Sequence, residues 1–176
     1  MESLKGRILG GTLAGSGAYD LATGEGGGKL SFARISFGAS SLGRWAPAWR
    51  PAGSGDADIE LAATRGKVRG TLSWKNPNGL ERAEGEKGTV GIRLPLSATA
   101  TADYYPGGAI RVVALRLRAG DAVLSGSGDI DPEDRTISLV GAFSLPGGRA
   151  ADYGWAYPVS WGSIAGEWET AWTAAN

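Results

Sequence analysis

Apolar and polar residues alternate along most of this chain, and that alternation constrains the fold more than any other feature of the sequence. The clearest run has apolar or small residues at every second position from 90 to 100. The same spacing recurs in 68–74, 113–117 and 137–145. A period of two places successive side chains on opposite faces of a strand. The pattern therefore predicts antiparallel strands that each bury one face.

Short segments rich in Gly, Pro, Asn and Asp separate these runs and predict tight turns. The expected turns are at 21–24, 76–79, 105–108, 118–121 and 131–134, of which 76–79 is interpreted as a hairpin. The expected strands lie near 4–20, 29–39, 57–65, 67–75, 80–86, 89–104, 109–118, 122–131, 135–145, 152–161 and 164–173. In the second strand the alternation slips between Phe32 and Ile35, which predicts a bulge near Ala33 and Arg34.

The last strand is open to a second interpretation. Ile164, Trp168 and Trp172 are spaced as on one face of a helix, and they also share the parity of a strand. Gly166 and the β-rich surroundings favour the strand. The chain's 30 glycines have no Gly-x-y period, and they fit the turns, bulges and bends of an all-β fold.

Sequential strands with short turns predict one all-β domain over residues 1–176. We expect an antiparallel up-and-down β-barrel of calycin-like architecture, because closure removes the edges of a sheet. A two-sheet β-sandwich is the alternative. The segment 40–56 is a long loop rich in Trp, Pro and Gly. Such a loop is expected either to cover the mouth of the barrel as a lid or to plug one end of it.

Composition excludes several classes of function. The chain has no histidine and no cysteine, which removes Ser-His-Asp triads, thiolate nucleophiles, disulfides and most zinc and copper sites. Its 18 basic and 18 acidic residues balance, and no basic stripe predicts nucleic-acid binding. We expect no membrane-spanning helix, no cofactor and no metal. The lack of cysteine and of an apolar signal segment predicts a cytoplasmic protein.

Carboxylates are the remaining candidates for acid–base chemistry. The acidic group at 129–134 is interpreted as a solvated hairpin tip rather than a calcium site, because its spacing matches no EF-hand loop. Asp20, Asp103 and Asp152 each stand beside a tyrosine. Such a carboxyl can have a raised pKa and act as an acid or base, although a turn-capping role is the more frequent one. No catalytic residue is assigned.

Aromatic side chains give the functional prediction. Tryptophan and tyrosine concentrate in the last quarter of the chain, and large rings line many ligand cavities. We expect them to enclose a small apolar or polycyclic ligand. The predicted lining residues are Trp45, Trp49, Trp74, Tyr104, Tyr105, Trp155, Tyr157, Trp161, Trp168 and Trp172.

The predicted function is therefore small-molecule binding in an aromatic-lined β-barrel. The protein would be either a carrier or a cofactor-independent cyclase or isomerase of bacterial specialised metabolism, which acts by folding and orienting its substrate. One alternative is a carbohydrate- or protein-binding module that uses exposed tryptophans. Another is a structural homo-oligomer in which Trp168 and Trp172 pack against a second copy of the chain.

Overall fold

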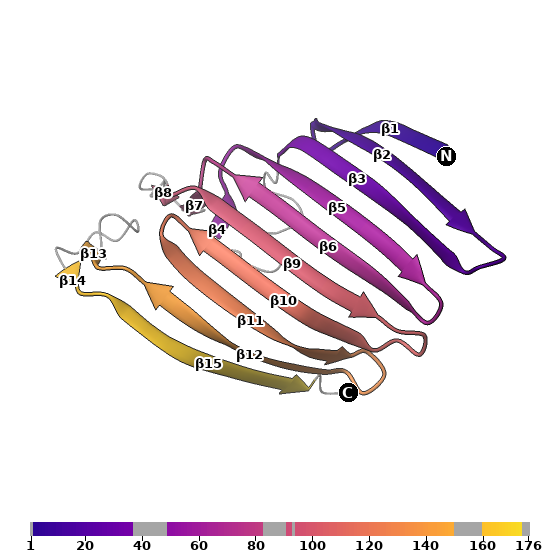
Figure 1. The fold of residues 1–176 in the computed structure, drawn as a ribbon. Helices are drawn as coiled ribbons and strands as arrows, with labels where there is room; N and C mark the ends of the chain where they lie inside the picture. Colours follow the sequence, from indigo (N-terminus) through magenta and orange to yellow (C-terminus); the bar gives the residue numbers. More distant parts are fainter. Residues whose placement is uncertain (1, 37–48, 83–90, 93, 150–159, 174–176) are drawn as a thin grey trace.

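Ten antiparallel strands form one large sheet in this computed structural model, which describes residues 2–36, 49–82, 91–92, 94–149 and 160–173 (Figure 1). The strands of this sheet, in their order across it, are β1 (Glu2–Ile8), β2 (Gly11–Asp20), β3 (Glu25–Ser36), β5 (Ser54–Thr64), β6 (Lys67–Asn76), β9 (Leu96–Tyr104), β10 (Ile110–Ala119), β11 (Ala122–Asp131), β12 (Thr136–Leu145) and β15 (Ile164–Thr173). The order across the sheet is the order along the chain. The predicted all-β, up-and-down antiparallel fold is thus confirmed.

The sheet has two edge strands, β1 and β15, which lie on opposite sides of it in Figure 1. No pairing joins β1 to β15 in the described part of the chain, so the predicted closure into a barrel is not shown. The described strands also do not divide into the two large sheets of a sandwich. Among the described residues, no helix has the length and apolar character needed to cross a bilayer.

Two small sheets accompany the large one. One joins β4 (Trp49–Pro51), β7 (Leu80–Arg82) and β8 (Gly91–Ile92), and the other joins β13 (Gly148–Arg149) and β14 (Ser160–Trp161). The predicted hairpin at 76–79 is therefore wrong in its pairing, because β7 pairs with β4 and β8 and not with β6. The side chain of Asn76 holds this region together. Its Nδ2 donates to the carbonyl oxygens of Ala52 and Gly79, and its Oδ1 accepts from the N–H of Asn78.

Several other segments can be compared with the sequence prediction. The bulge near Ala33 and Arg34 is confirmed, since the register shifts between Phe32 and Ile35. Segment 164–173 is a strand, as favoured. The predicted strand 4–20 is instead two strands joined by a turn at Leu9 and Gly10, whose φ angles are 47° and 78°.

The predicted long loop at 40–56 contains β4 and the beginning of β5, while its residues 40–48 lie outside the described ones. Of the predicted strand 152–161, residues 160–161 are described, and they form β14.

The register gives the large sheet two different faces. Residues paired directly across strands share a face, so each cross-strand row can be followed from β1 to β15. One row on the first face, called the apolar face below, is Leu4, Gly15, Leu30, Ile59, Leu72, Ala100, Leu115, Gly126, Gly141 and Trp168. The adjacent row on the second face, called the polar face, is Lys5, Ala14, Ser31, Asp58, Ser73, Thr99, Arg116, Ser125, Ala142 and Glu167.

The apolar face has no second layer over most of its area in the described structure. Among the described hydrophobic side chains, Ile35 alone is buried. A sheet with one apolar face ordinarily buries that face against another element. The described residues leave most of this face uncovered, so it is the candidate binding surface of the molecule.

Candidate functional site

The apolar face is partly exposed among the described residues and almost free of polar groups. Nine of the thirteen exposed large hydrophobic residues of the described chain lie on it: Leu4, Ile8, Tyr19, Leu61, Leu72, Tyr104, Leu117, Ile164 and Trp172. From Leu4 onward, its register positions carry apolar residues or glycine, with Asn76 and Thr170 as the polar exceptions. An exposed apolar surface of this extent is typical of an interaction site.

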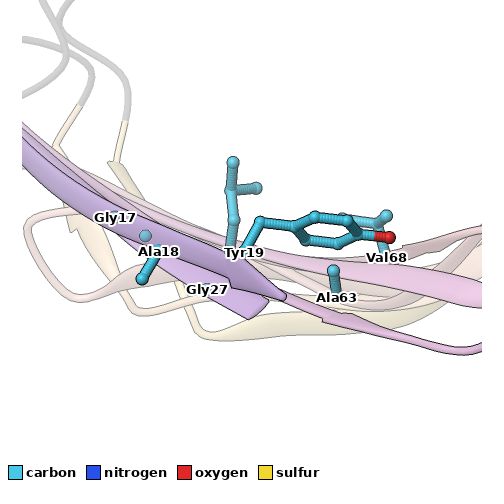
Figure 2. A pocket seen from close by; sticks show the side chains of 8 residues that line it. Gly17, Ala18, Tyr19, Gly27, Ala63 and Val68 are labelled. Atoms are coloured by element: carbon cyan, nitrogen blue, oxygen red, sulfur yellow. The ribbon is translucent and has the colours of Figure 1, made fainter. Parts of the chain in front are cut away.

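A groove crosses this face where two glycines are paired. Gly17 of β2 lies directly opposite Gly28 of β3, so the backbone forms the floor of the groove. Tyr19, Leu61 and Val68 line the groove, which has a volume of about 690 Å³. Figure 2 shows Tyr19 and Val68 on one side of the sheet, while Ala18 points to the other side. The groove can therefore take a ligand on the apolar face against bare backbone.

The groove continues toward the β1 edge of the sheet. A neighbouring hollow shares Gly17, Gly28 and Leu61 with it and extends to Leu4 and Leu30. Together the two form an elongated depression over β1, β2, β3 and β5. Such a shape suits an extended hydrocarbon better than a compact one.

Large side chains on this face lie over glycines of nearby strands. A Cβ added to Gly26 would stand 2.6 Å from Cδ2 of Tyr19, and one on Gly126 would stand 2.6 Å from Cζ2 of Trp168. The indole of Trp168 also donates from Nε1 to the carbonyl oxygen of Ser125 at 3.1 Å. Packing rings over glycines compensates for the missing side chains. These rings are therefore held by the sheet itself.

The predicted aromatic residues are spread over the molecule. The apolar face carries Trp74, Tyr104, Trp168 and Trp172. Tyr105 lies in the turn after β9, and Trp161 lies in β14, where its Nε1 donates to the carbonyl oxygen of Pro146 at 3.1 Å. Trp49 belongs to β4, but its side chain is outside the description, as are Trp45, Trp155 and Tyr157. Four strands separate Trp74 from Trp168 in the sheet, so the described rings do not form one cluster.

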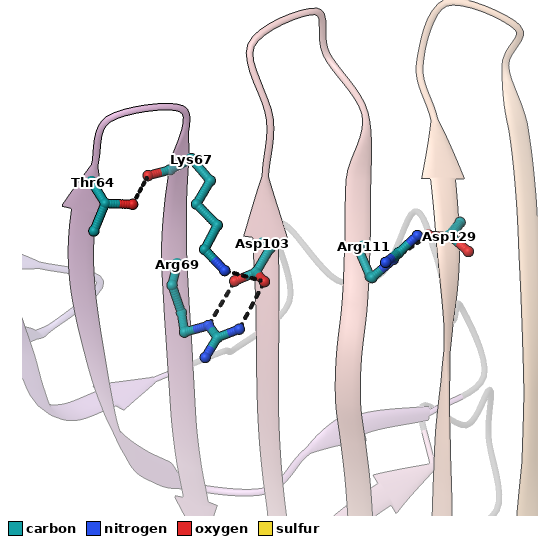
Figure 3. Close-up of polar contacts among 6 residues, drawn as sticks. All are labelled: Thr64, Lys67, Arg69, Asp103, Arg111 and Asp129. Atoms are coloured by element: carbon teal, nitrogen blue, oxygen red, sulfur yellow. Dashed lines mark hydrogen bonds and ion pairs between the residues drawn. The ribbon is translucent and has the colours of Figure 1, made fainter.

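The polar face holds charged groups in pairs. Asp103 is buried, with 3% of its surface exposed, and it binds two cations from β6 (Figure 3). Arg69 donates to its carboxylate at 2.6 and 2.8 Å, and Lys67 donates at 3.1 Å. On the neighbouring strands, Arg111 Nε lies 3.1 Å from Oδ1 of Asp129. These contacts fix the register of β6, β9, β10 and β11 through charge as well as through backbone bonds.

The carboxylates that stood out in the sequence do not have the properties of a catalytic acid. The hydrogen bonds from Arg69, with those from Lys67, hold the pKa of Asp103 well below its ordinary value. Backbone N–H groups of Ala22 and Thr23 likewise lower the pKa of Asp20, which caps its turn. The capping role favoured by the sequence is confirmed for Asp20, and neither residue has the raised pKa that was the less frequent alternative; Asp152 lies outside the described residues.

The acidic turn after β11 is explained by its own hydrogen bonds. Oδ1 of Asp131 accepts from the backbone N–H groups of Glu133 and Asp134. The described part of the chain contains no group of three or more residues suited to hold a metal ion. The hairpin-tip interpretation of this segment agrees with these contacts.

Sequence reasoning missed the groove, because it treated glycines mainly as turn and bulge residues. The signal was present in the parity of Gly15 and Gly17 with Leu13 and Tyr19, which placed glycines on the apolar side of a strand. Comparison with protein-family models, with curated proteins and with solved structures finds no match to this chain.

Proposed function

We propose that this protein binds a hydrocarbon-rich ligand on the apolar face of its large sheet, and that the groove over Gly17 and Gly28 is the main binding site. The observation that supports this proposal is the extent of the face, which is apolar from β1 to β15 and partly exposed in the described structure. The proposed ligand is apolar, as predicted from the sequence, but the proposed site is an open groove and not an aromatic-lined cavity.

The chemistry of the face favours a hydrocarbon. No Asp, Glu, Lys or Arg occupies its register positions from Leu4 onward, and Lys29 of the polar face is the charged residue that lines the adjoining hollow. Burial of apolar area is then the main source of binding energy, at about 0.8 kcal/mol per buried CH₂. About ten methylenes would contribute roughly 8 kcal/mol before the cost of association is subtracted. Because the depression is elongated, an acyl chain is the expected ligand class, and it is favoured over a compact polycyclic hydrocarbon.

The other predicted functions receive less support. Sugar binding needs several hydrogen-bonding groups beside the rings, and from Leu4 onward the apolar face offers the side chains of Asn76 and Thr170 and the hydroxyls of Tyr19 and Tyr104. A cyclase would need a group that stabilises developing charge, and neither Asp20 nor Asp103 fills that role. Closure of the sheet into a barrel around the apolar face would enclose the ligand. Binding to the open face does not depend on that closure.

The test is titration of the purified protein with a dansyl-labelled fatty acid, followed by the blue shift and rise of its emission. Leu61→Asp places a charge in the groove and should weaken binding at least tenfold, since burial of a carboxylate against hydrocarbon costs more than about 1.4 kcal/mol. Leu61 is exposed, so the substitution should leave the far-UV circular dichroism unchanged.

Ala62→Asp is the matched control, because Ala62 is the next residue of β5 and faces the polar side. It should bind the probe as the parent protein does. Equal loss of binding in both variants, or no binding by the parent, would contradict the proposal. Displacement of the probe by a soluble oligosaccharide would instead favour the carbohydrate-binding alternative.

A further inference from the structure

The two edges of the large sheet are open in the described structure. No described strand pairs with the outer side of β1 or of β15. Such edges present rows of backbone N–H and C=O groups that can pair with another strand. Exposed apolar side chains reach both edges, with Leu4 and Ile8 on β1 and Ile164 and Trp172 on β15. Each edge therefore offers backbone hydrogen bonds and an apolar surface together.

The polar face of these edges carries complementary charge. β1 has Lys5 and Arg7 two residues apart, and β15 has Glu167 and Glu169 two residues apart. All four are exposed, and none makes an ion pair within the described part of the chain. By contrast, Lys29 at the β3–β5 contact reaches Glu60 at 2.9 Å. The edges thus display a basic pair and an acidic pair with the same spacing.

We propose that β1 of one chain pairs with β15 of a second copy, so that the sheets join head to tail. Successive strands alternate in direction across the ten-stranded sheet, so its first and last strands run in opposite directions. A copy in the same orientation therefore brings β1 antiparallel to β15. The charges select the register in which Lys5 lies opposite Glu169 and Arg7 lies opposite Glu167.

This register also fits the apolar face. It places Gly6 opposite Trp168 and Gly166 opposite Ile8. Within the chain, Trp168 already lies over a glycine that is its direct partner, Gly141. A Cβ added to Gly6 would meet nothing within 4 Å, so its site has room for a ring from a neighbour. The register thus places a glycine with open space above it beside Trp168, whose indole stays over Gly126 and Gly141.

A second copy is the occupant because each edge carries the complement of the other. Eight strands lie between β1 and β15 within one chain, whereas any neighbouring copy presents the required edge directly. The contact is heterologous, since one surface meets a different surface of the partner. Pairing of β1 with β15 of the same chain is the competing outcome.

Disulfide trapping separates these outcomes, because the chain has no cysteine of its own. One preparation carries Leu4→Cys and the other carries Thr170→Cys, which the register places opposite each other. Mild oxidation of the mixture should give a covalent heterodimer on a non-reducing gel. Leu4→Cys mixed with Leu61→Cys is the control, since Leu61 lies inside the sheet on the same face. An internal disulfide in a monomer carrying both Leu4→Cys and Thr170→Cys would overturn the proposal in favour of closure.

Charge reversal tests the register by sedimentation velocity over a concentration series. Lys5→Glu with Arg7→Glu should weaken self-association about tenfold or more, since two favourable cross-strand pairs become repulsive. Glu167→Lys with Glu169→Lys should do the same. Mixing the two variants should restore association, because an acidic β1 then meets a basic β15.

Arg116→Glu with Arg118→Glu is the matched control, placed on the polar face of β10 inside the sheet. It should leave the association constant unchanged. Failure of the mixed variants to associate, or a parent protein that stays monomeric at every concentration, would overturn the proposal.

Discussion

Gly126→Ala tests whether the rings on the apolar face are held by the glycines beneath them. Gly126 lies on β11, and a Cβ there would stand 2.6 Å from Cζ2 and 3.0 Å from Cη2 of Trp168, and 2.9 Å from the carbonyl oxygen of Val140. Since 2.6 Å is closer than two carbon atoms can approach, the indole must move. Its movement would strain the hydrogen bond from Nε1 to the carbonyl oxygen of Ser125.

The expected cost is about 2 kcal/mol of unfolding free energy. Overpacking of this kind costs about 1–3 kcal/mol, and the lost hydrogen bond costs about 1 kcal/mol. Alanine also lowers the conformational entropy of the unfolded chain, which offsets about 0.4–1 kcal/mol of this cost. Gly70→Ala is the control in β6, where the new Cβ would make an ordinary contact of 3.5 Å with Cδ2 of Leu61. Its effect should stay within about 1 kcal/mol.

A double-mutant cycle with Trp168→Ala isolates the contribution of the ring. Urea unfolding followed by far-UV circular dichroism gives each free energy without depending on tryptophan fluorescence. Without the indole, Gly126→Ala should cost about 1–2 kcal/mol less, and the remainder should reflect the contact with Val140. An equal cost in both backgrounds would refute the argument that Trp168 occupies the space above Gly126.

Three further substitutions test the polar contacts. Asp103→Asn should lower stability at neutral pH. Because the pKa of Asp103 is lowered in the folded state, its contribution to stability is present above about pH 4 and is lost as the pH falls below that value. The melting temperatures of variant and parent should therefore converge in acid. A constant difference in melting temperature across the pH range would contradict the pairing of Asp103 with Arg69. Asn76→Ala should cost roughly 2–3 kcal/mol in urea unfolding, because a buried side chain loses two donated bonds and one accepted bond. Asp131→Ala should cost about 1 kcal/mol by the same measurement, and no change would remove its turn-capping role.

The strands were predictable because their signal is local. Alternation at 137–145 and 164–173 identified β12 and β15, and the slip near Arg34 identified a bulge that the register confirms. The turn at Leu9 and Gly10 was missed although Gly10-Gly11 is a turn signal, because apolar residues continue on both sides of it and the segment was assigned to one long strand. The predicted hairpin at 76–79 was wrong in its pairing. Its residues do reverse the chain, but the strand that follows, β7, pairs with β4 and β8 and not with β6.

The candidate site was less predictable, because it depends on what stands across from each residue. Gly17 and Gly28 form a groove floor only because the register pairs them. Asp103 has a lowered pKa because β6 places Arg69 and Lys67 against it, which neither the capping role nor the acid–base role considered from the sequence had included. Neither partner is near Asp103 in sequence.

By itself the sequence determined that the chain forms antiparallel strands with one apolar and one polar side, because side-chain direction in a strand follows from residue parity alone. The absence of histidine and cysteine likewise settled which nucleophiles the chain lacks. Tertiary structure decided which strands become neighbours, which glycines meet, and that the edges β1 and β15 stay apart in the described sheet. Alternation shows that a strand has an apolar face, but the element that covers that face is set by contacts between distant segments.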